Sequence, residues 1–250
     1  MNNKAKKVYE VSVTECNNFC ARAYQYQNLY KLGFTQYKPI DTPHFYGARG
    51  TLVHFCLSQE LKGQKFKFRY EDFKQDKQIR DNIPEWMFQG CLDDVMDYYE
   101  KGLQIIRDYK PYFDDAIVEE RLWANPISNV LLGGTPDARN SRAIVDWKTS
   151  KYSAKMFKEY AKQLMGYDLL FYLNGDYTER EKVIVFLGDL HPVVKILTKE
   201  QEEEAQAEFI KDMYNTVKKK QEIEKSEGWM PVQPQFFCIM CKHINVCRGV

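Results

Sequence analysis

The sequence predicts an α/β fold in which helices flank a central sheet and a cysteine-rich tail follows at the C-terminal end. In residues 1–110 the apolar positions recur at helical spacing, whereas residues 111–200 contain the short apolar runs that are typical of strands. Residues 201–250 begin with the pattern of a polar helix and end with three cysteines. Because no long linker, repeat or low-complexity segment separates these parts, we expect a single domain over residues 1–250.

Three helices are expected in the N-terminal part. The first covers residues 13–30, with Thr14 as its N-cap. The second carries His54 and ends at Gly63, since glycine readily adopts the conformation that terminates helices. The third is a long helix over residues 86–109, in which apolar residues recur at helix-like intervals.

The next part of the chain is expected to form a sheet. Its apolar runs, read as strands of one sheet, are residues 116–124, 128–138, 142–149, 181–190 and 192–198. Residues 155–175 carry an apolar stripe at helical spacing, so we expect a helix that crosses over the sheet. Thr198 then caps a polar helix that extends to about residue 225.

Charge balance and missing motifs exclude several classes of protein. The 36 basic and 35 acidic residues leave a formal net charge of +1, so any nucleic-acid site must be a local patch. Neither a GxxxxGK[ST] loop nor a GxGxxG fingerprint occurs, which argues against a nucleotide-driven motor and a dinucleotide site. The N-terminal segment lacks the apolar core of a signal peptide, and no apolar run approaches about 20 residues. We therefore expect a cytoplasmic protein with no membrane partner.

The cysteines point to metal binding at the C-terminal end. The chain contains Cys16, Cys20, Cys56, Cys91, Cys238, Cys241 and Cys247. An odd number in a chain with no export signal argues against a disulfide framework. Cys56 and Cys91 lie on apolar helix faces and are read as core residues. The last three stand within ten residues, in a tail too short to bury three thiols, so we expect a metal there. Zinc is one candidate, with His243 as its fourth ligand, although the position of His243 between two of the cysteines makes tetrahedral closure awkward.

The segment GGTPDARNSRAIVDWKTSK carries the strongest chemical signal. Asp137 ends a strand-turn, and Asp146 and Lys148 alternate on the next strand, which places them on one face and Trp147 on the other. Two carboxylates brought together across a hairpin repel each other unless a hard cation, such as Mg²⁺ or Mn²⁺, lies between them. A lysine beside that cation can orient its water or neutralise charge on a phosphodiester. An isolated Asp-x-Lys is usually a surface ion pair, so the pattern needs support from the rest of the chain.

That support comes from motifs elsewhere in the sequence. Pro136-Asp137 followed by Asp146-Trp147-Lys148 resembles the core of PD-(D/E)xK nucleases. The run GTLVH, which ends at His54, resembles the histidine motif of the RecB-like branch, and Gln163-x3-Tyr167 resembles the QxxxY motif of that branch. The resemblance covers nearly the whole chain and implies a restriction-endonuclease-like core with a central mixed sheet. It makes residues 111–200 the catalytic core.

The resemblance also implies roles for individual residues. The ligands of a Mg²⁺ or Mn²⁺ ion would be His54, Asp137, Asp146 and the backbone carbonyl of Trp147. Asp137, Asp146 and Lys148 would be the catalytic residues, and Gln163 and Tyr167 would face the substrate strand. Their spacing independently places Gln163 and Tyr167 on one side of a helix.

The tail resembles that of RecB-like nucleases with an iron-sulfur cluster, of the AddB and CRISPR-associated RecB-like exonuclease types. The resemblance implies a [4Fe–4S] cluster held by Cys238, Cys241 and Cys247, with Cys20 as the fourth ligand. Cys20 begins the run CARAYQY, in which alanine follows where the family commonly has proline. Cys16, one helical turn earlier, is the competing choice for the fourth ligand.

Basic residues gather around the predicted site. They are Lys148, Lys151, Lys155, Lys158 and Lys162, with Arg139 and Arg142 flanking the hairpin. Such a cluster can attract phosphates although the total charge is balanced, and we assign Lys151 to substrate binding. Residues 218–220 are also basic but stand in a mixed-charge helix, so they are read as a solvated face.

These observations predict a metal-dependent deoxyribonuclease, an exonuclease that acts on DNA ends or single strands in recombination, repair or processing. The alternative is a DNA-binding accessory of a helicase, recombinase or integration complex, in which cleavage is secondary. A third reading is a metal-stapled interaction protein without enzymatic activity. The complete set of His54, Asp137, Asp146 and Lys148 favours the enzyme, since a nonenzymatic descendant would be expected to lose at least one member. DNA is thus the expected partner, and a helicase or recombination protein is a candidate second one.

Overall fold

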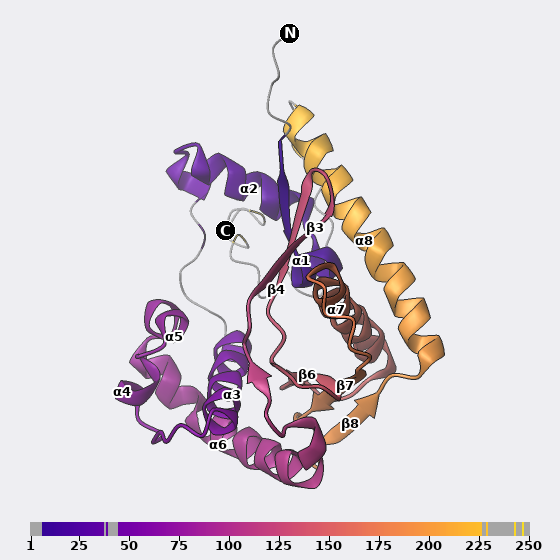
Figure 1. The fold of residues 1–250 in the computed structure, drawn as a ribbon. Helices are drawn as coiled ribbons and strands as arrows, with labels where there is room; N and C mark the ends of the chain where they lie inside the picture. Colours follow the sequence, from indigo (N-terminus) through magenta and orange to yellow (C-terminus); the bar gives the residue numbers. More distant parts are fainter. Residues whose placement is uncertain are drawn as a thin grey trace.

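A five-stranded mixed sheet lies at the centre of the lower half of the molecule as drawn in Figure 1. The computed structural model describes residues 7–37, 39, 45–226, 229, 243 and 247. The strand order is β2 (Ile117–Val118), β5 (Ala138–Arg139), β6 (Ala143–Lys148), β7 (Glu181–Phe186) and β8 (Val193–Ile196). β6 and β7 run parallel, and the other neighbouring pairs are antiparallel. The α/β class and the mixed sheet are therefore confirmed.

A second sheet corrects the expectation that all strands share one sheet. Its order is β1 (Tyr9–Ser12), β4 (Val130–Gly134) and β3 (Leu122–Ile127), with β1 parallel to β4 and β3 antiparallel to it. The chain runs from β4 into β5 through Pro136, which has no backbone N–H to donate to a ladder. The run expected as one strand over residues 128–138 thus divides between two sheets.

The N-terminal helix is also divided. Instead of one helix over residues 13–30, α1 (Val13–Asn18) and α2 (Ala21–Lys31) are separated by extended backbone at Phe19 and Cys20. The N-cap of α1 is Ser12 rather than Thr14, because the Ser12 side chain accepts a hydrogen bond from the Glu15 backbone N–H and the Glu15 side chain accepts one from the Ser12 backbone N–H.

The other expected helices are present. They are α3 (Phe45–Leu61), α6 (Glu85–Asp108), α7 (Ala154–Leu173) and α8 (Lys199–Lys225), and the weakly patterned stretch before α6 forms the short α4 (Tyr70–Phe73) and α5 (Lys77–Asn82). Single 3₁₀ turns occur at η1 (Thr35–Tyr37) and η2 (Lys110–Tyr112). Thr198 caps α8 together with Gln201, as predicted for Thr198. Within the described part of the chain, no helix has both the length and the apolar character needed to cross a bilayer.

The central sheet separates two apolar clusters. Alternate residues of β6 serve the two sides, so Val145 and Trp147 pack toward α3 and α6, whereas Ile144 packs toward α7 and α8. Trp147 is buried and its ring stacks on Phe113 at 5.3 Å between centroids, as expected for a core residue. Cys56 and Cys91 lie in the same cluster, which confirms their assignment to the core.

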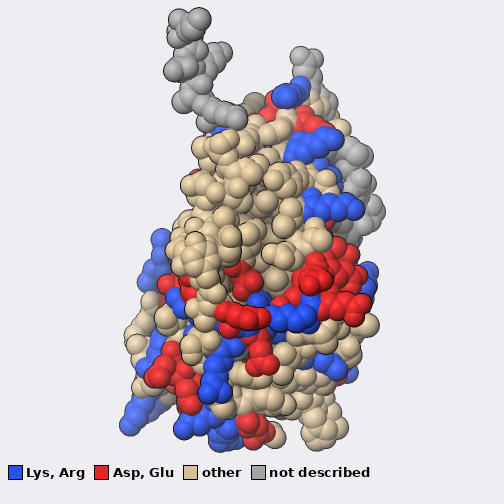
Figure 2. Space-filling model, turned by 45° about the vertical axis from the view of Figure 1, so that its right-hand side comes forward, with Lys and Arg blue, Asp and Glu red and all other residues tan. Residues whose placement is uncertain are grey.

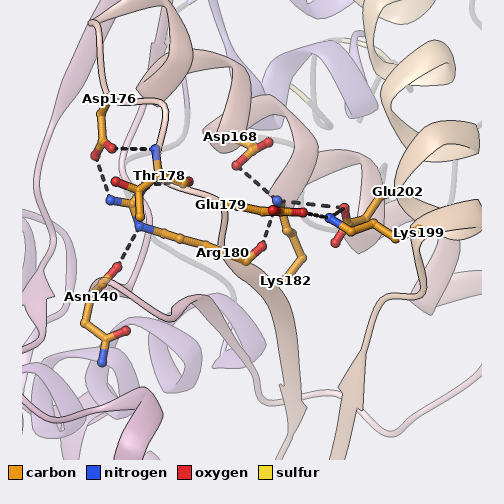
Figure 3. Close-up of polar contacts among 9 residues, drawn as sticks. All are labelled: Asn140, Asp168, Asp176, Thr178, Glu179, Arg180, Lys182, Lys199 and Glu202. Carbon is orange, nitrogen blue, oxygen red and sulfur yellow. Dashed lines mark hydrogen bonds and ion pairs between the residues drawn. The ribbon is translucent and has the colours of Figure 1, made fainter.

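Buried cations tie the end of α7 and the start of β7 to their surroundings (Figure 3). Lys182, on β7, lies 3.2 Å from Asp168 of α7 and 3.9 Å from Glu202 of α8. Arg180 donates to Asp176 at 2.7 Å and to the backbone carbonyl of Asn140 at 2.6 Å. These contacts fix the segment that leads from α7 back into the sheet.

Candidate active site

Asp137 joins the helical part of the chain to the sheet. Its side chain lies in the turn between β4 and β5, where Oδ1 is 2.9 Å from Nδ1 of His54 on α3. Its Oδ2 accepts a hydrogen bond from the backbone N–H of Trp147 on β6 at 2.7 Å. One carboxylate thus positions both the imidazole and the strand that carries Asp146 and Lys148.

Asp146 and Lys148 lie on the same face of β6, as the strand pattern predicts. Lys148 Nζ is 2.5 Å from Asp146 Oδ2, and Asp146 is only 1% exposed. The side chain of Trp147 points to the opposite cluster. A buried carboxylate costs free energy unless it is paired, so this pair depends on the groups around it.

Two residues of α7 complete the polar network. Gln163 accepts a hydrogen bond from Lys148 at 3.1 Å, lies 3.4 Å from Asp146 Oδ1 through its amide nitrogen, and donates to the hydroxyl of Tyr167 at 2.6 Å. Both Gln163 and Tyr167 are buried, and the i, i+4 spacing places them side by side as expected. The helix therefore holds the lysine and the aspartate of β6 through one amide group.

The pKa values of the four ionisable groups reflect their burial and their charges on one another. Burial raises the pKa of Asp146, Lys148 opposes that rise and the charge of Asp137 adds to it, so that the pKa of Asp146 is raised to about 6. Burial also acts to raise the pKa of Asp137, but the neighbouring His54 outweighs it and lowers that pKa. For His54 and Lys148, burial lowers the pKa, and the carboxylates Asp137 and Asp146 reverse the effect and raise it. The carboxylates thus attract cationic partners into a buried site.

Comparison with known proteins identifies the family to which a chain with this arrangement of residues belongs. The family model of the PD-(D/E)XK nuclease superfamily matches residues 10–248. The chain belongs to this superfamily. No curated protein matches the sequence. The crystal structure of a candidate exonuclease from Eubacterium rectale is similar in fold, with a TM-score of 0.51, 13% sequence identity and 91% of each chain covered.

Members of the PD-(D/E)XK superfamily generally use a divalent metal, and the donor set suits one. His54, Asp137 and Asp146 supply an imidazole and two carboxylates, and hard cations prefer oxygen ligands. Asp146 Oδ2 is buried, and Lys148 Nζ, 2.5 Å away, balances its charge. Among the described residues, however, no three His, Cys, Asp or Glu side chains already converge on one point. Instead, His54 contacts the carboxylate of Asp137, and Lys148 contacts the carboxylate of Asp146.

The basic cluster expected around this nuclease-family site is partly neutralised. Lys162 is buried and pairs with Asp212 at 2.9 Å, and Lys158 pairs with Glu204 at 3.3 Å. Arg139 pairs with Glu120 at 2.7 Å. The prediction of one basic surface is wrong for these residues, because acidic residues distant in the sequence fold against them. Basic and acidic side chains also intermingle on the face shown in Figure 2.

Two further basic predictions have different outcomes. Lys151 lies in the loop after β6 and is exposed, so its side chain is accessible to a substrate. Lys220, read as part of a solvated face, is buried and pairs with Glu15 at 2.8 Å. This contact is unforeseen because Glu15 lies some two hundred residues earlier in the chain.

The predicted metal-cluster tail lies mostly outside the described residues. Cys238 and Cys241 are not described, and Cys20 and Cys247 are free thiols. Within the described ranges no cysteine cluster is evident. Burial raises the pKa of the Cys16 thiol to about 12, which disfavours the thiolate that a metal requires.

The described residues of the tail do pack on α2. The ring of Tyr26 lies 5.6 Å from that of Trp229 and 5.8 Å from that of His243. Cys20 is the N-cap residue of α2, so it lies on the helix against which Trp229 and His243 pack.

Sequence reasoning missed two neighbours of the site. Tyr160 places its ring 4.3 Å from Lys148 Nζ, and the side chain of Thr14 lies near the hydroxyl of Tyr167. Tyr160 could have been found from its position three residues before Gln163 on the same helix. No local signal indicates Thr14, because its contact with α7 depends on how β1 and α1 fold against that helix.

Proposed function

We propose that the chain is a metal-dependent deoxyribonuclease, an exonuclease that hydrolyses phosphodiesters at DNA ends or in single strands during recombination, repair or processing. The observation that carries this proposal is the convergence of Asp137, Asp146 and Lys148 in a member of the PD-(D/E)XK superfamily. The similarity in fold to a candidate exonuclease favours action at ends over internal cleavage.

In this proposal the cation is held by His54, Asp137, Asp146 and the carbonyl of Trp147. When bound, it would activate a water and neutralise charge on the phosphate. Asp137 has two tasks, since its hydrogen bond from the Trp147 N–H also fixes the strand on which the other ligands lie. The contact between His54 and Asp137 holds the imidazole toward the carboxylate before any cation arrives.

Lys148 is proposed as the catalytic lysine. Its ammonium group lies between Asp146 and Gln163, with the ring of Tyr160 on one side. This position restricts the long side chain and keeps its positive charge beside the reacting phosphate, where charge develops during cleavage. Gln163 and Tyr167, which the sequence assigns to the substrate strand, are both buried. In this proposal they act through the lysine and the aspartate, and Lys151 contacts the substrate strand from the exposed loop.

We also propose the [4Fe–4S] cluster, with Cys20, Cys238, Cys241 and Cys247 as ligands. The packing of Trp229 and His243 on α2 supports a tail that can reach Cys20. Protein purified without oxygen should contain about four iron and four sulfide per chain. One stoichiometric zinc in place of the iron would contradict the cluster.

The proposed nuclease is tested with end-labelled single- and double-stranded DNA, with and without Mn²⁺. Wild-type protein should shorten the labelled strand only with the metal, and Asp146→Ala should abolish cleavage while retaining DNA binding. Asp93→Ala, which removes an exposed carboxylate of α6, is the matched control and should cleave like wild type. Cleavage retained in the Asp146 variant would contradict the catalytic assignment, and DNA binding without cleavage by the wild type would favour the accessory function.

A further inference from the structure

The segment between α3 and α4 alternates basic and aromatic residues, a combination that is typical of surfaces that bind nucleic acids. Residues 64–69 form an irregular segment with a bend at Phe68 and Arg69, and exposure alternates from Lys65 to Arg69. Lys65, Lys67 and Arg69 are exposed, whereas Phe66 and Phe68 are half-buried. The cations therefore lie in solvent, while the two rings pack against the apolar cluster of α3 and α6.

Three aromatic side chains, Phe66, Phe68 and Tyr99, line a groove on the surface. Phe66 and Phe68 meet each other at 5.4 Å between ring centroids, and each lies within 5.6 Å of Tyr99 on α6. The groove beside them has a volume of about 660 Å³ and is lined by all three rings and by the three cations. Aromatic rings and cations therefore border one space.

The acidic residues that also line the groove are already engaged. Glu60 accepts a hydrogen bond from the Tyr99 hydroxyl at 2.8 Å, and Asp72 is paired with Arg69 at 3.1 Å. For Lys65 and Lys67, no ion pair is found among the described residues. The ammonium groups of Lys65 and Lys67 are thus available to bind an anionic ligand.

We propose that this groove, formed by residues 64–69 and Tyr99, binds single-stranded nucleic acid at a distance from the cleavage site. Proteins that bind single strands combine a positively charged groove with aromatic rings on which bases stack, and both features occur here. The inference rests on the proposed nuclease function for the identity of the strand. An acidic peptide would use the two lysines but would have no need of the three rings.

The position of the groove defines its role. Glu60 follows His54 by six residues on α3, which is about 9 Å along the helix axis and on a different face of the helix. A strand held in the groove therefore does not lie at His54 itself. The groove anchors a part of the substrate that is remote from the scissile phosphate, so it should affect long substrates and leave short ones unchanged.

The test measures binding of fluorescent single-stranded DNA to the full chain over a series of salt concentrations, in wild type and in Lys65→Ala/Lys67→Ala. For an oligonucleotide of about 20 residues, losing two phosphate contacts should lower the slope of log Kd against log salt by about 1.4 and weaken binding about 10- to 30-fold at 0.1 M salt. An oligonucleotide of about four residues should bind and be cleaved as in wild type. Lys65→Arg/Lys67→Arg should restore the slope, because it keeps both charges.

Lys218→Ala/Lys219→Ala removes two exposed lysines of α8 and serves as the matched control. The proposal is overturned if the groove variant and this control have equal slopes, or if the short oligonucleotide is affected as strongly as the long one. It is also overturned if the groove variant loses binding to a glutamate-rich peptide and keeps binding to DNA. Binding is also measured in the Asp146→Ala background, where the DNA stays intact, and cleavage is measured in the proteins that keep Asp146. If the proteins that keep Asp146 do not cleave DNA but the slope still changes, the nuclease assignment fails and the groove stands.

Discussion

Gln163 shows how one uncharged residue can organise a charged site. Its amide contacts Lys148, Asp146 and the hydroxyl of Tyr167. Gln163→Ala should lower kcat about 10- to 100-fold with little change in KM, because it removes a group that positions the catalytic pair rather than one that binds DNA. Steady-state cleavage of end-labelled DNA measures both constants.

Tyr167→Phe is the companion of that variant, since it removes one hydrogen bond and keeps the ring. It should lower kcat less than Gln163→Ala does. A rise in KM with kcat unchanged in the Gln163 variant would show that the amide contacts the substrate instead.

The sequence predicts which side chains of the site are neighbours when both residues belong to the same strand or helix. Alternation on a strand places Asp146 beside Lys148, and helical spacing places Gln163 beside Tyr167. The partners of Lys162 and Lys220 could not be predicted in this way. Each is buried against an acidic residue on another element, and no short-range pattern specifies such contacts.

Asp176 provides a pH-dependent contribution to stability. The hydrogen bond from Arg180 lowers the pKa of Asp176 from its ordinary value of 3.8 to about 2. Since the folded-state pKa is the lower one, the stabilisation is complete above the unfolded-state pKa and is lost as the pH falls toward 2. Asp176→Asn should therefore lower the free energy of unfolding by up to about 2 kcal/mol near pH 7, and by progressively less below about pH 4.

Urea unfolding of wild type and variant across that range measures the difference, with Asp93→Asn as the control for loss of one exposed carboxylate. A difference that stays constant from pH 7 to about pH 3 would exclude the ionised pair as its source.

At the scale of elements, caps decide where helices begin. The side chain of Thr198 accepts a hydrogen bond from the Gln201 backbone N–H at 3.3 Å, and the Gln201 side-chain oxygen accepts one from the Thr198 backbone N–H at 3.0 Å. Thr198→Ala should lower the free energy of unfolding by about 1 kcal/mol, whereas Thr198→Ser keeps the acceptor oxygen and should cost much less. Thermal unfolding followed by circular dichroism compares the two, and equal losses would show that the methyl group rather than the cap matters.

Element boundaries were predictable where a strong local signal ends the pattern. Thr198 and Gly63 are such signals, and α8 and α3 begin and end beside them. The expected single helix over residues 13–30 was wrong because apolar residues continue at helical spacing across the break. The extended backbone of Phe19 and Cys20 separates α1 from α2, and no apolar position marks that break.

At the scale of the molecule, the central sheet serves as one wall of both apolar clusters. Val183 and Val185 of β7 belong to the cluster with α3 and α6, and Ile184 and Phe186 belong to the cluster with α7 and α8. The catalytic residues stand where these two halves meet, since Asp137 contacts α3 and Asp146 contacts α7. Neither half can lose its packing without disturbing the strands of the other.

This shared wall predicts that the two halves unfold together. Leu164 is fully buried in the cluster with α7, and Leu164→Ala should lower the free energy of unfolding by about 2–5 kcal/mol. Trp147 reports on the other cluster once the exposed Trp86, Trp123 and Trp229 are replaced by Phe. In that background, Leu164→Ala should lower the urea midpoint of Trp147 fluorescence and of far-ultraviolet circular dichroism by the same amount, because a two-state molecule has one transition for all probes.

Leu57→Ala, a matched cavity in the cluster that holds Trp147, should likewise move both midpoints together. If Leu164→Ala moved the dichroism midpoint and left Trp147 fluorescence unchanged, the sheet would not couple the halves, and the active site would lie between two units that unfold separately.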